Sequence, residues 1–238
     1  MTNFPLLLAL MGSLALPLAG CGNWGVDGNG ERVDEDRAVA PFTRVRSDCE
    51  LDVQLTQGDQ QSLTVSLDSN LQDLVQTSVD GDTLYLNLKD NVDQTVDGPH
   101  ILIRVPQLSA AKLAGSGSMT LAFDEPEQPL DLYLSGSGDL RFSGKTAALG
   151  ARLGGSGNLQ LEGETSDVDM TLSGSGEIRG RGLTAASASI DLSGSGRISA
   201  TVQESVKVTL SGSGQIDLYG GAALDSYRDT GSGDVVQH

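Results

Sequence analysis

The chain has 238 residues, a formal net charge of −17 and a sequence pI of about 4.2. This charge argues against nucleic acid as a partner, and against docking on anionic lipid through charge, because both need a basic patch. The length is sufficient for one domain with its own apolar core.

Residues 1–20 have the features of an export signal. An uncharged apolar run extends from Phe4 to Gly20, and it is short for a transmembrane helix. It ends in Leu18-Ala19-Gly20-Cys21, which resembles the lipobox of bacterial lipoproteins, in which cleavage precedes an acylated cysteine. The resemblance implies lipidation at Cys21, and Gly22 after it implies sorting to the outer membrane. The alternative is an ordinary secretory signal followed by an incidental cysteine.

Residues 21–38 are predicted to form a flexible, acidic and glycine-rich tether. The segment contains Gly, Asn, Asp and Glu and few large apolar side chains. It would hold the folded domain a short way from the membrane to which Cys21 is anchored.

Residues 39–112 have strand patterns without a repeat. Apolar and polar residues alternate in four short runs: 51–55, 63–67, 84–88 and 101–105. Asp80-Gly81-Asp82 predicts a tight hairpin turn just before the run 84–88. We expect this segment to form irregular early turns and a cap of the repeat structure that follows.

Cys49 lies two residues before the first of these runs. If Cys21 is acylated, Cys49 has no intramolecular disulfide partner. It precedes Leu51 and Val53 by steps of two residues, so it has the same parity and lies on the same face of the strand. We therefore expect a small buried side chain, with a reactive thiol as the alternative.

Residues 113–238 carry seven copies of Gly-Ser-Gly, with a mean spacing of about 19 residues. Around each copy, apolar and polar residues alternate with a period of two, which indicates strands with one buried face. One repeat would hold two or three short strands and cannot bury its apolar face alone. The repeats must therefore stack as the turns, or rungs, of an all-β solenoid. A propeller is the rival architecture, but its blades need about 40 residues.

The glycines of the repeat share the parity of buried residues. Either the backbone there approaches a neighbouring rung too closely for a side chain, or it bends through φ values that suit only glycine. The predicted structural glycines are Gly115, Gly117, Gly136, Gly138, Gly155, Gly157, Gly174, Gly176, Gly194, Gly196, Gly212, Gly214, Gly231 and Gly233. The serines between them have the exposed parity and are predicted to form one column that serves as a binding face: Ser116, Ser137, Ser156, Ser175, Ser195, Ser213 and Ser232.

Several short motifs occur in an order that resembles a known bacterial family. They are Phe42…Val45, Val53-Gln54-Leu55-Thr56-Gln57-Gly58-Asp59, Asp80-Gly81-Asp82-Thr83-Leu84, Ile103-Arg104-Val105-Pro106 and the serial Ser-Gly-Ser-Gly. Together they resemble the family described as putative auto-transporter adhesin, head GIN domain, over about residues 39–238. The resemblance implies an exported domain built as a right-handed parallel β-helix-like solenoid. It implies no established reaction, ligand or catalytic residue.

No catalytic, cofactor or metal site is predicted. Seven equivalent serines cannot share His100 and His238 as bases, and no phosphate-binding Gly-Lys-Ser/Thr motif is present. A calcium ladder would use the residues after each Gly-Ser-Gly, which are Ser118, Asp139, Asn158, Glu177, Arg197, Gln215 and Asp234. Only three are carboxylates, and Glu177 could instead pair with Arg197 across one rung.

The predicted function is therefore non-catalytic. We expect an envelope lipoprotein that is held at the membrane by its lipid and presents the serine face to an envelope glycan or protein. The alternative is a carbohydrate-active β-helix lyase or hydrolase, for which Asp167 and Asp169 are candidates by proximity only. Carboxylates clustered on one face of the solenoid would favour the enzyme, and their absence would favour the binding scaffold.

Overall fold

The computed structural model describes residues 26–89, 92–93 and 100–238. The predicted signal 1–20, the start of the predicted tether and the predicted lipidation site Cys21 lie outside the described residues. No helix among the described residues has the length and hydropathy that a membrane span requires.

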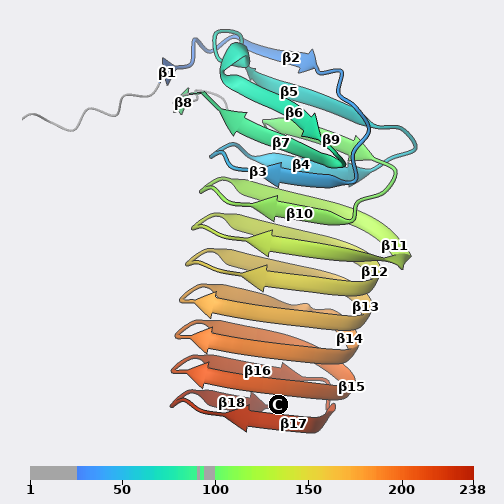
Figure 1. Ribbon diagram of the computed structural model, residues 1–238, viewed down its shortest axis with the longest axis vertical. Helices are drawn as coiled ribbons and strands as arrows, with labels where there is room; N and C mark the ends of the chain where they lie inside the picture. The colour runs from blue at the N-terminus through green and yellow to red at the C-terminus, as the bar shows by residue number, and fades with distance from the viewer. Residues whose placement is uncertain (1–25, 90–91, 94–99) are drawn as a thin grey trace, which may run out of the picture.

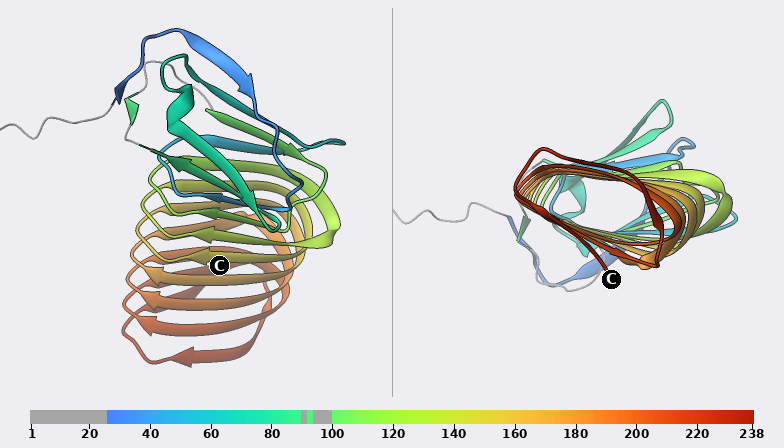
Figure 2. Two further views of the ribbon diagram at one scale, coloured as in Figure 1. Left: turned by 45° about the horizontal axis from the view of Figure 1, so that its top comes forward. Right: turned by 90° about the horizontal axis from the view of Figure 1, so that it is seen from below.

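Successive turns of the chain stack in parallel register into a solenoid (Figure 1), and Figure 2 shows the same stack from two further directions. The all-β solenoid predicted from the repeat is confirmed. Five long strands pair in chain order: β11 (Ser118–Leu134), β12 (Asp139–Leu153), β13 (Asn158–Gly174), β14 (Glu177–Gly194) and β15 (Arg197–Gly212). Three shorter strands continue the stack: β16 (Gln215–Tyr219), β17 (Ala223–Asp229) and β18 (Asp234–Gln237).

The expectation of two or three short strands per repeat is wrong for β11 to β15. Each is a single strand of 15 to 18 residues that bends around most of one rung. In the central rungs the bend falls at Gly144 and Gly163, which pair with each other in the ladder and have φ of +145° and +122°. Because these glycines bend the strand without leaving the ladder, no turn interrupts it.

The N-terminal strands build early rungs and a more irregular end to the stack. They are β1 (Val26–Asp27), β2 (Arg32–Asp36), β3 (Arg44–Ser47), β4 (Val53–Gln57), β5 (Ser62–Asp68), β6 (Val75–Asp80), β7 (Thr83–Leu88), β8 (Val92–Asp93), β9 (Ile101–Val105) and β10 (Ala110–Leu113), with a 3-10 helix η1 at Gln72–Leu74. β10 and β4 pair in parallel with β11. β6 and β7 form the hairpin predicted at Gly81.

The predicted flexible tether is wrong at its C-terminal end. Residues 32–36 form β2, which pairs antiparallel with β5 along its whole length. β5 already pairs with β9 on its other side, so β2 occupies the edge that β5 would otherwise leave open. The pairing gives hydrogen-bond partners to backbone N–H and C=O groups of a segment that composition alone predicts to be a loop.

The core is a continuous stack of inward-facing apolar side chains. One of its columns passes through five rungs and is formed by Leu140, Leu159, Ile178, Ile198 and Ile216, all of them fully buried. Cys49 is also buried, as its parity predicts, and its Sγ lies 3.2 Å from the Ser47 hydroxyl. Burial raises the pKa of the Cys49 thiol, which favours the unreactive protonated form.

The Gly-Ser-Gly corners bring successive backbones too close for a side chain. A Cβ on Gly176 would overlap the carbonyl oxygen of Gly157 one rung away, although its φ is ordinary. A Cβ on Gly174 would overlap the carbonyl oxygen of Gly155, and Gly174 also has a φ of +151°. Close approach therefore explains Gly176, whereas close approach and backbone bending both act at Gly174.

Candidate binding surfaces

The serine column predicted from the repeat is exposed along its whole length. All seven serines, from Ser116 to Ser232, face solvent. Hydroxyls of successive rungs approach within hydrogen-bond distance at two places: Ser156 to Ser175 at 3.3 Å and Ser213 to Ser232 at 3.2 Å. The column is thus a set of equivalent hydroxyl groups repeated from rung to rung.

A second hydroxyl column lies two residues before the first. It contains the exposed residues Ser135, Ser173, Ser193, Ser211 and Thr230, and the other two repeats have the exposed Gly154 and the half-buried Ala114 at this place. We call these two columns together the serine strip. Sequence reasoning missed the second column, although the recurring Leu-Ser-Gly-Ser-Gly motif was a visible signal for it. The strip contains no charged residue, unlike the rest of this strongly acidic chain.

Several of the polar residues that follow Gly-Ser-Gly form local pairs. Asn158 donates to Asp139 at 2.9 Å, and Arg197 donates to Gln215 at 3.1 Å. The pairing of Glu177 with Arg197 is wrong: Glu177 binds Arg179 at 2.7 Å instead, since Arg179 lies two residues along on the same face. No group of three potential metal ligands lies together in the part of the chain that the structure describes.

Both histidines have partners away from the serine strip. His100 is buried, and its Nδ1 accepts a hydrogen bond from the Asp52 amide at 3.1 Å. His238 stacks on Tyr219, with ring centroids 4.4 Å apart, and lies 3.1 Å from Asp217. Both histidines therefore make contacts other than the serine–histidine pair that a serine nucleophile needs.

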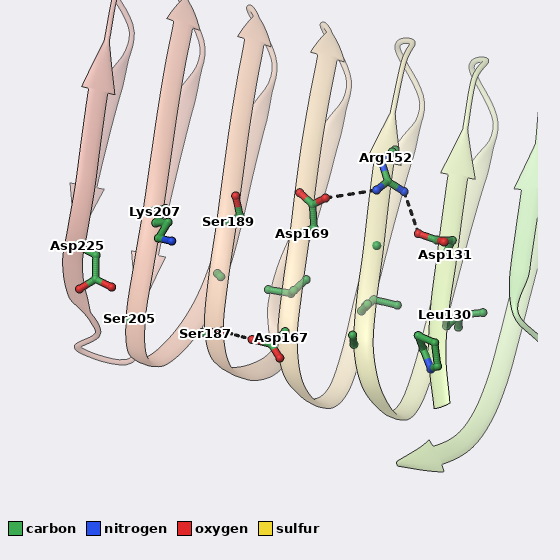
Figure 3. A pocket seen from close by; sticks show the side chains of 16 residues that line it. Leu130, Asp131, Arg152, Asp167, Asp169, Ser187, Ser189, Ser205, Lys207 and Asp225 are labelled. Carbon is green, nitrogen blue, oxygen red and sulfur yellow. Dashed lines mark hydrogen bonds and ion pairs between the residues drawn. The ribbon is translucent and has the colours of Figure 1, made fainter. Parts of the chain in front are cut away.

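A groove of about 410 Å³ crosses several rungs on another part of the surface (Figure 3). Two rows of outward-facing residues, paired in register, form its walls. One row is Asp131, Gly150, Asp169, Ser189 and Lys207; the other is Pro129, Ala148, Asp167, Ser187 and Ser205. Between them lie the buried residues Leu130, Leu149, Val168 and Ala188. The groove therefore runs along the solenoid axis, across the strands.

Arg152 joins two carboxylates of the first wall. Its guanidinium lies 2.8 Å from Asp131 and 3.3 Å from Asp169, which belong to the rungs on either side. The hydrogen bond to Asp131 is the main cause of the raised pKa of Arg152. The guanidinium also donates to the Tyr133 hydroxyl at 3.1 Å. A Cβ on Gly150 would overlap the Asp131 carboxylate, so the missing side chain makes room for this bridge.

The groove gathers carboxylates that the sequence places far apart. Asp167 and Asp169, candidates from proximity in sequence, both line it, and Asp167 accepts a hydrogen bond from Ser187. Asp131 and Asp225 join them from other rungs, as do the cations Arg152 and Lys207. Sequence reasoning missed these four, because only the register of the rungs brings them together. The arrangement can hydrogen-bond a polar ligand through several fixed groups.

Comparison with known proteins gives a consistent picture. The family model described as putative auto-transporter adhesin, head GIN domain, matches residues 41–222. A putative adhesin from Bacteroides fragilis has a similar structure, with a TM-score of 0.79 and 20% identity over 90% of this chain and 100% of that one. A putative lipid binding protein from Parabacteroides distasonis gives 0.69 and 23% over 90% and 99%, and a putative adhesin from the same organism gives 0.67 and 22% over 90% and 100%. At these identities the likeness shows the fold alone. No match was found among curated proteins.

Proposed function

Because this chain belongs to the putative auto-transporter adhesin, head GIN domain family, we propose that it is an exported, non-catalytic binding protein of the cell envelope. Its binding face is the serine strip. The observation that carries this proposal is the exposure of the same uncharged hydroxyl groups in every repeat from Ser116 to Ser232. Equivalent groups repeated at the spacing of the rungs can each make a weak contact with an extended partner.

Such a face should tolerate single substitutions. Replacing Ser156, Ser175, Ser195 or Ser213 singly by alanine should change binding to isolated cell envelopes little. Replacing all four should weaken it by on the order of 10²-fold, since many weak contacts multiply in a multivalent interaction. Sedimentation of the protein with envelope fractions measures both. The substitutions lie on the surface, so melting of the fourfold variant should stay close to that of the parent. One serine whose loss abolishes binding would contradict the repeated face and indicate a discrete site.

We further propose that the protein is a lipoprotein anchored through Cys21, and that it is sorted to the outer membrane. The support is the segment Leu18-Ala19-Gly20-Cys21 after an apolar run, with Gly22 following it. One diacylated or triacylated cysteine would supply the membrane affinity that the acidic surface does not.

The anchor is tested by replacing one residue. The Cys21→Ala variant should leave the membrane fraction and appear in the soluble fraction, because it lacks the thiol that carries the lipid. Fractionation followed by immunoblotting measures the distribution, and incorporation of a labelled fatty acid into the parent provides the positive control. A variant that sediments with membranes as fully as the parent would show that the anchor lies elsewhere.

The second candidate function is a carbohydrate-active enzyme, and the observation that favours it is the clustering of carboxylates in the groove. A carboxylic acid that donates a proton near neutral pH is usually buried, because burial keeps it protonated at that pH. The side chains of Asp131 and Asp169 are 48% and 47% exposed, and both are held by Arg152. These features suit hydrogen bonding to a ligand better than proton transfer, so we favour a binding role for the groove as well.

A further inference from the structure

We infer that the groove is a second binding site, which takes a neutral, hydroxyl-rich glycan chain laid along the solenoid axis. The inference rests on the proposed binding role but not on the serine strip, which lies on a different part of each rung. The two surfaces can therefore be tested separately.

The shape of the groove suits an extended chain. Each wall has five residues from five successive rungs, which at the spacing of paired strands corresponds to roughly 20 Å. On the two rungs that flank the middle one, the wall side chains are short, notably Gly150, Ala148 and Ser189. Since both walls and the apolar floor between them run across the strands, a linear ligand would contact every rung in turn.

The first wall is also fixed in position. Gly150 sits in the middle of β12 with an ordinary φ, so backbone conformation does not require glycine there. A glycine in the middle of a strand lowers the stability of the fold, and an exposed ion pair raises it by at most about 1 kcal/mol. Stability therefore does not account for the arrangement. Its effect is to hold the carboxylates of Asp131 and Asp169 on either side of Arg152 (Figure 3).

The charges of the groove select the ligand class. A polyanion would meet the carboxylates of Asp131, Asp167, Asp169 and Asp225, in a chain of net charge −17. A polycation would find Asp131 and Asp169 already paired with Arg152, and it would also meet Lys207. Sugar hydroxyls both donate and accept, so a neutral glycan can donate to the carboxylates and accept from the two cations. The hydroxyls of Ser187, Ser189 and Ser205 can contribute in either sense.

The experiment measures binding of the purified full chain to an array of neutral, uronate-containing and amino-sugar oligosaccharides, with titration of the best neutral ligand. Ser189→Trp fills the groove at an exposed position without removing a charge, and it should weaken binding at least about tenfold. Asp169→Asn should do the same by removing one end of the Arg152 bridge. The matched control is Thr120→Trp, at an exposed position of β11 outside both the groove and the serine strip, which should bind the glycan as the parent does. Ser193→Trp, four residues along β14 from Ser189, tests the serine strip separately. Unchanged melting of all four variants establishes that they fold.

Three results would overturn the inference. The first is that no neutral glycan binds, or that acidic or amino-sugar chains bind more tightly. The second is that Ser193→Trp weakens binding while Ser189→Trp does not, which would assign the glycan to the serine strip and leave the proposed binding role intact. The third is that the bound glycan is shortened during the incubation, which would replace the binding site by the enzyme.

Discussion

Replacing Gly144 by valine is expected to lower the free energy of unfolding by at least about 3 kcal/mol. Gly144 lies at the bend of β12 with a φ of +145°, a conformation that β-branched residues rarely adopt. A Cβ there would overlap the backbone carbonyl of Phe123 in the preceding rung. Because the obstacle is backbone rather than a flexible side chain, relief requires the two rungs to separate and their ladder to open.

The matched control for this change is Gly154→Ala. Gly154 is exposed, and a Cβ at this position would meet nothing closer than the Ser173 hydroxyl at 3.9 Å. We expect a change within about 0.5 kcal/mol, since the backbone there is ordinary and other rungs carry serine at this place. Urea unfolding followed by circular dichroism measures both variants. Similar losses for the two glycines would contradict the close approach at the bend.

Replacing Phe142 by alanine is expected to cost about 3–5 kcal/mol. The Phe142 ring is 2% exposed and stacks in register between the fully buried Leu121 and Leu161 of the neighbouring rungs. Its loss leaves a cavity between rungs that the stacked ladders cannot close, because the spacing of the strands is set by backbone hydrogen bonds. Urea unfolding again measures the loss.

The control for the aromatic ring is Tyr227→Ala. The Tyr227 ring is 48% exposed on β17, so its removal should change stability far less than that of Phe142. If Phe142→Ala were as stable as Tyr227→Ala, the ring could not be part of a tightly packed core. If the urea unfolding curve of Phe142→Ala showed two steps and only one of them moved to lower urea, the rungs would be unfolding separately, as repeat structures allow.

The two candidate surfaces depend differently on the order of the rungs. The serine strip follows from the repeat itself, since every copy of Gly-Ser-Gly contributes the same groups. The groove depends on differences between repeats, because Asp131, Gly150 and Asp169 occupy equivalent places in three rungs.

The all-β solenoid, the buried faces of the strands and the glycine corners can be predicted from the sequence. These features are local: a period of two, a repeat of about 19 residues and a tripeptide without large side chains specify them without knowledge of neighbours. Even the burial of Cys49 follows from its parity with Leu51.

Contacts between side chains of different rungs could not be predicted from the sequence, because they depend on how the rungs stack. Asp131, Arg152 and Asp169 are brought together by lateral register, which is set by the backbone ladder between strands rather than by any local pattern. The bend at Gly144 was missed for the same reason, since its sequence context carries no tripeptide signal and its conflict is with Phe123 in another rung. β2 likewise forms because β5 has an open edge, a property of the assembled sheet and not of residues 32–36.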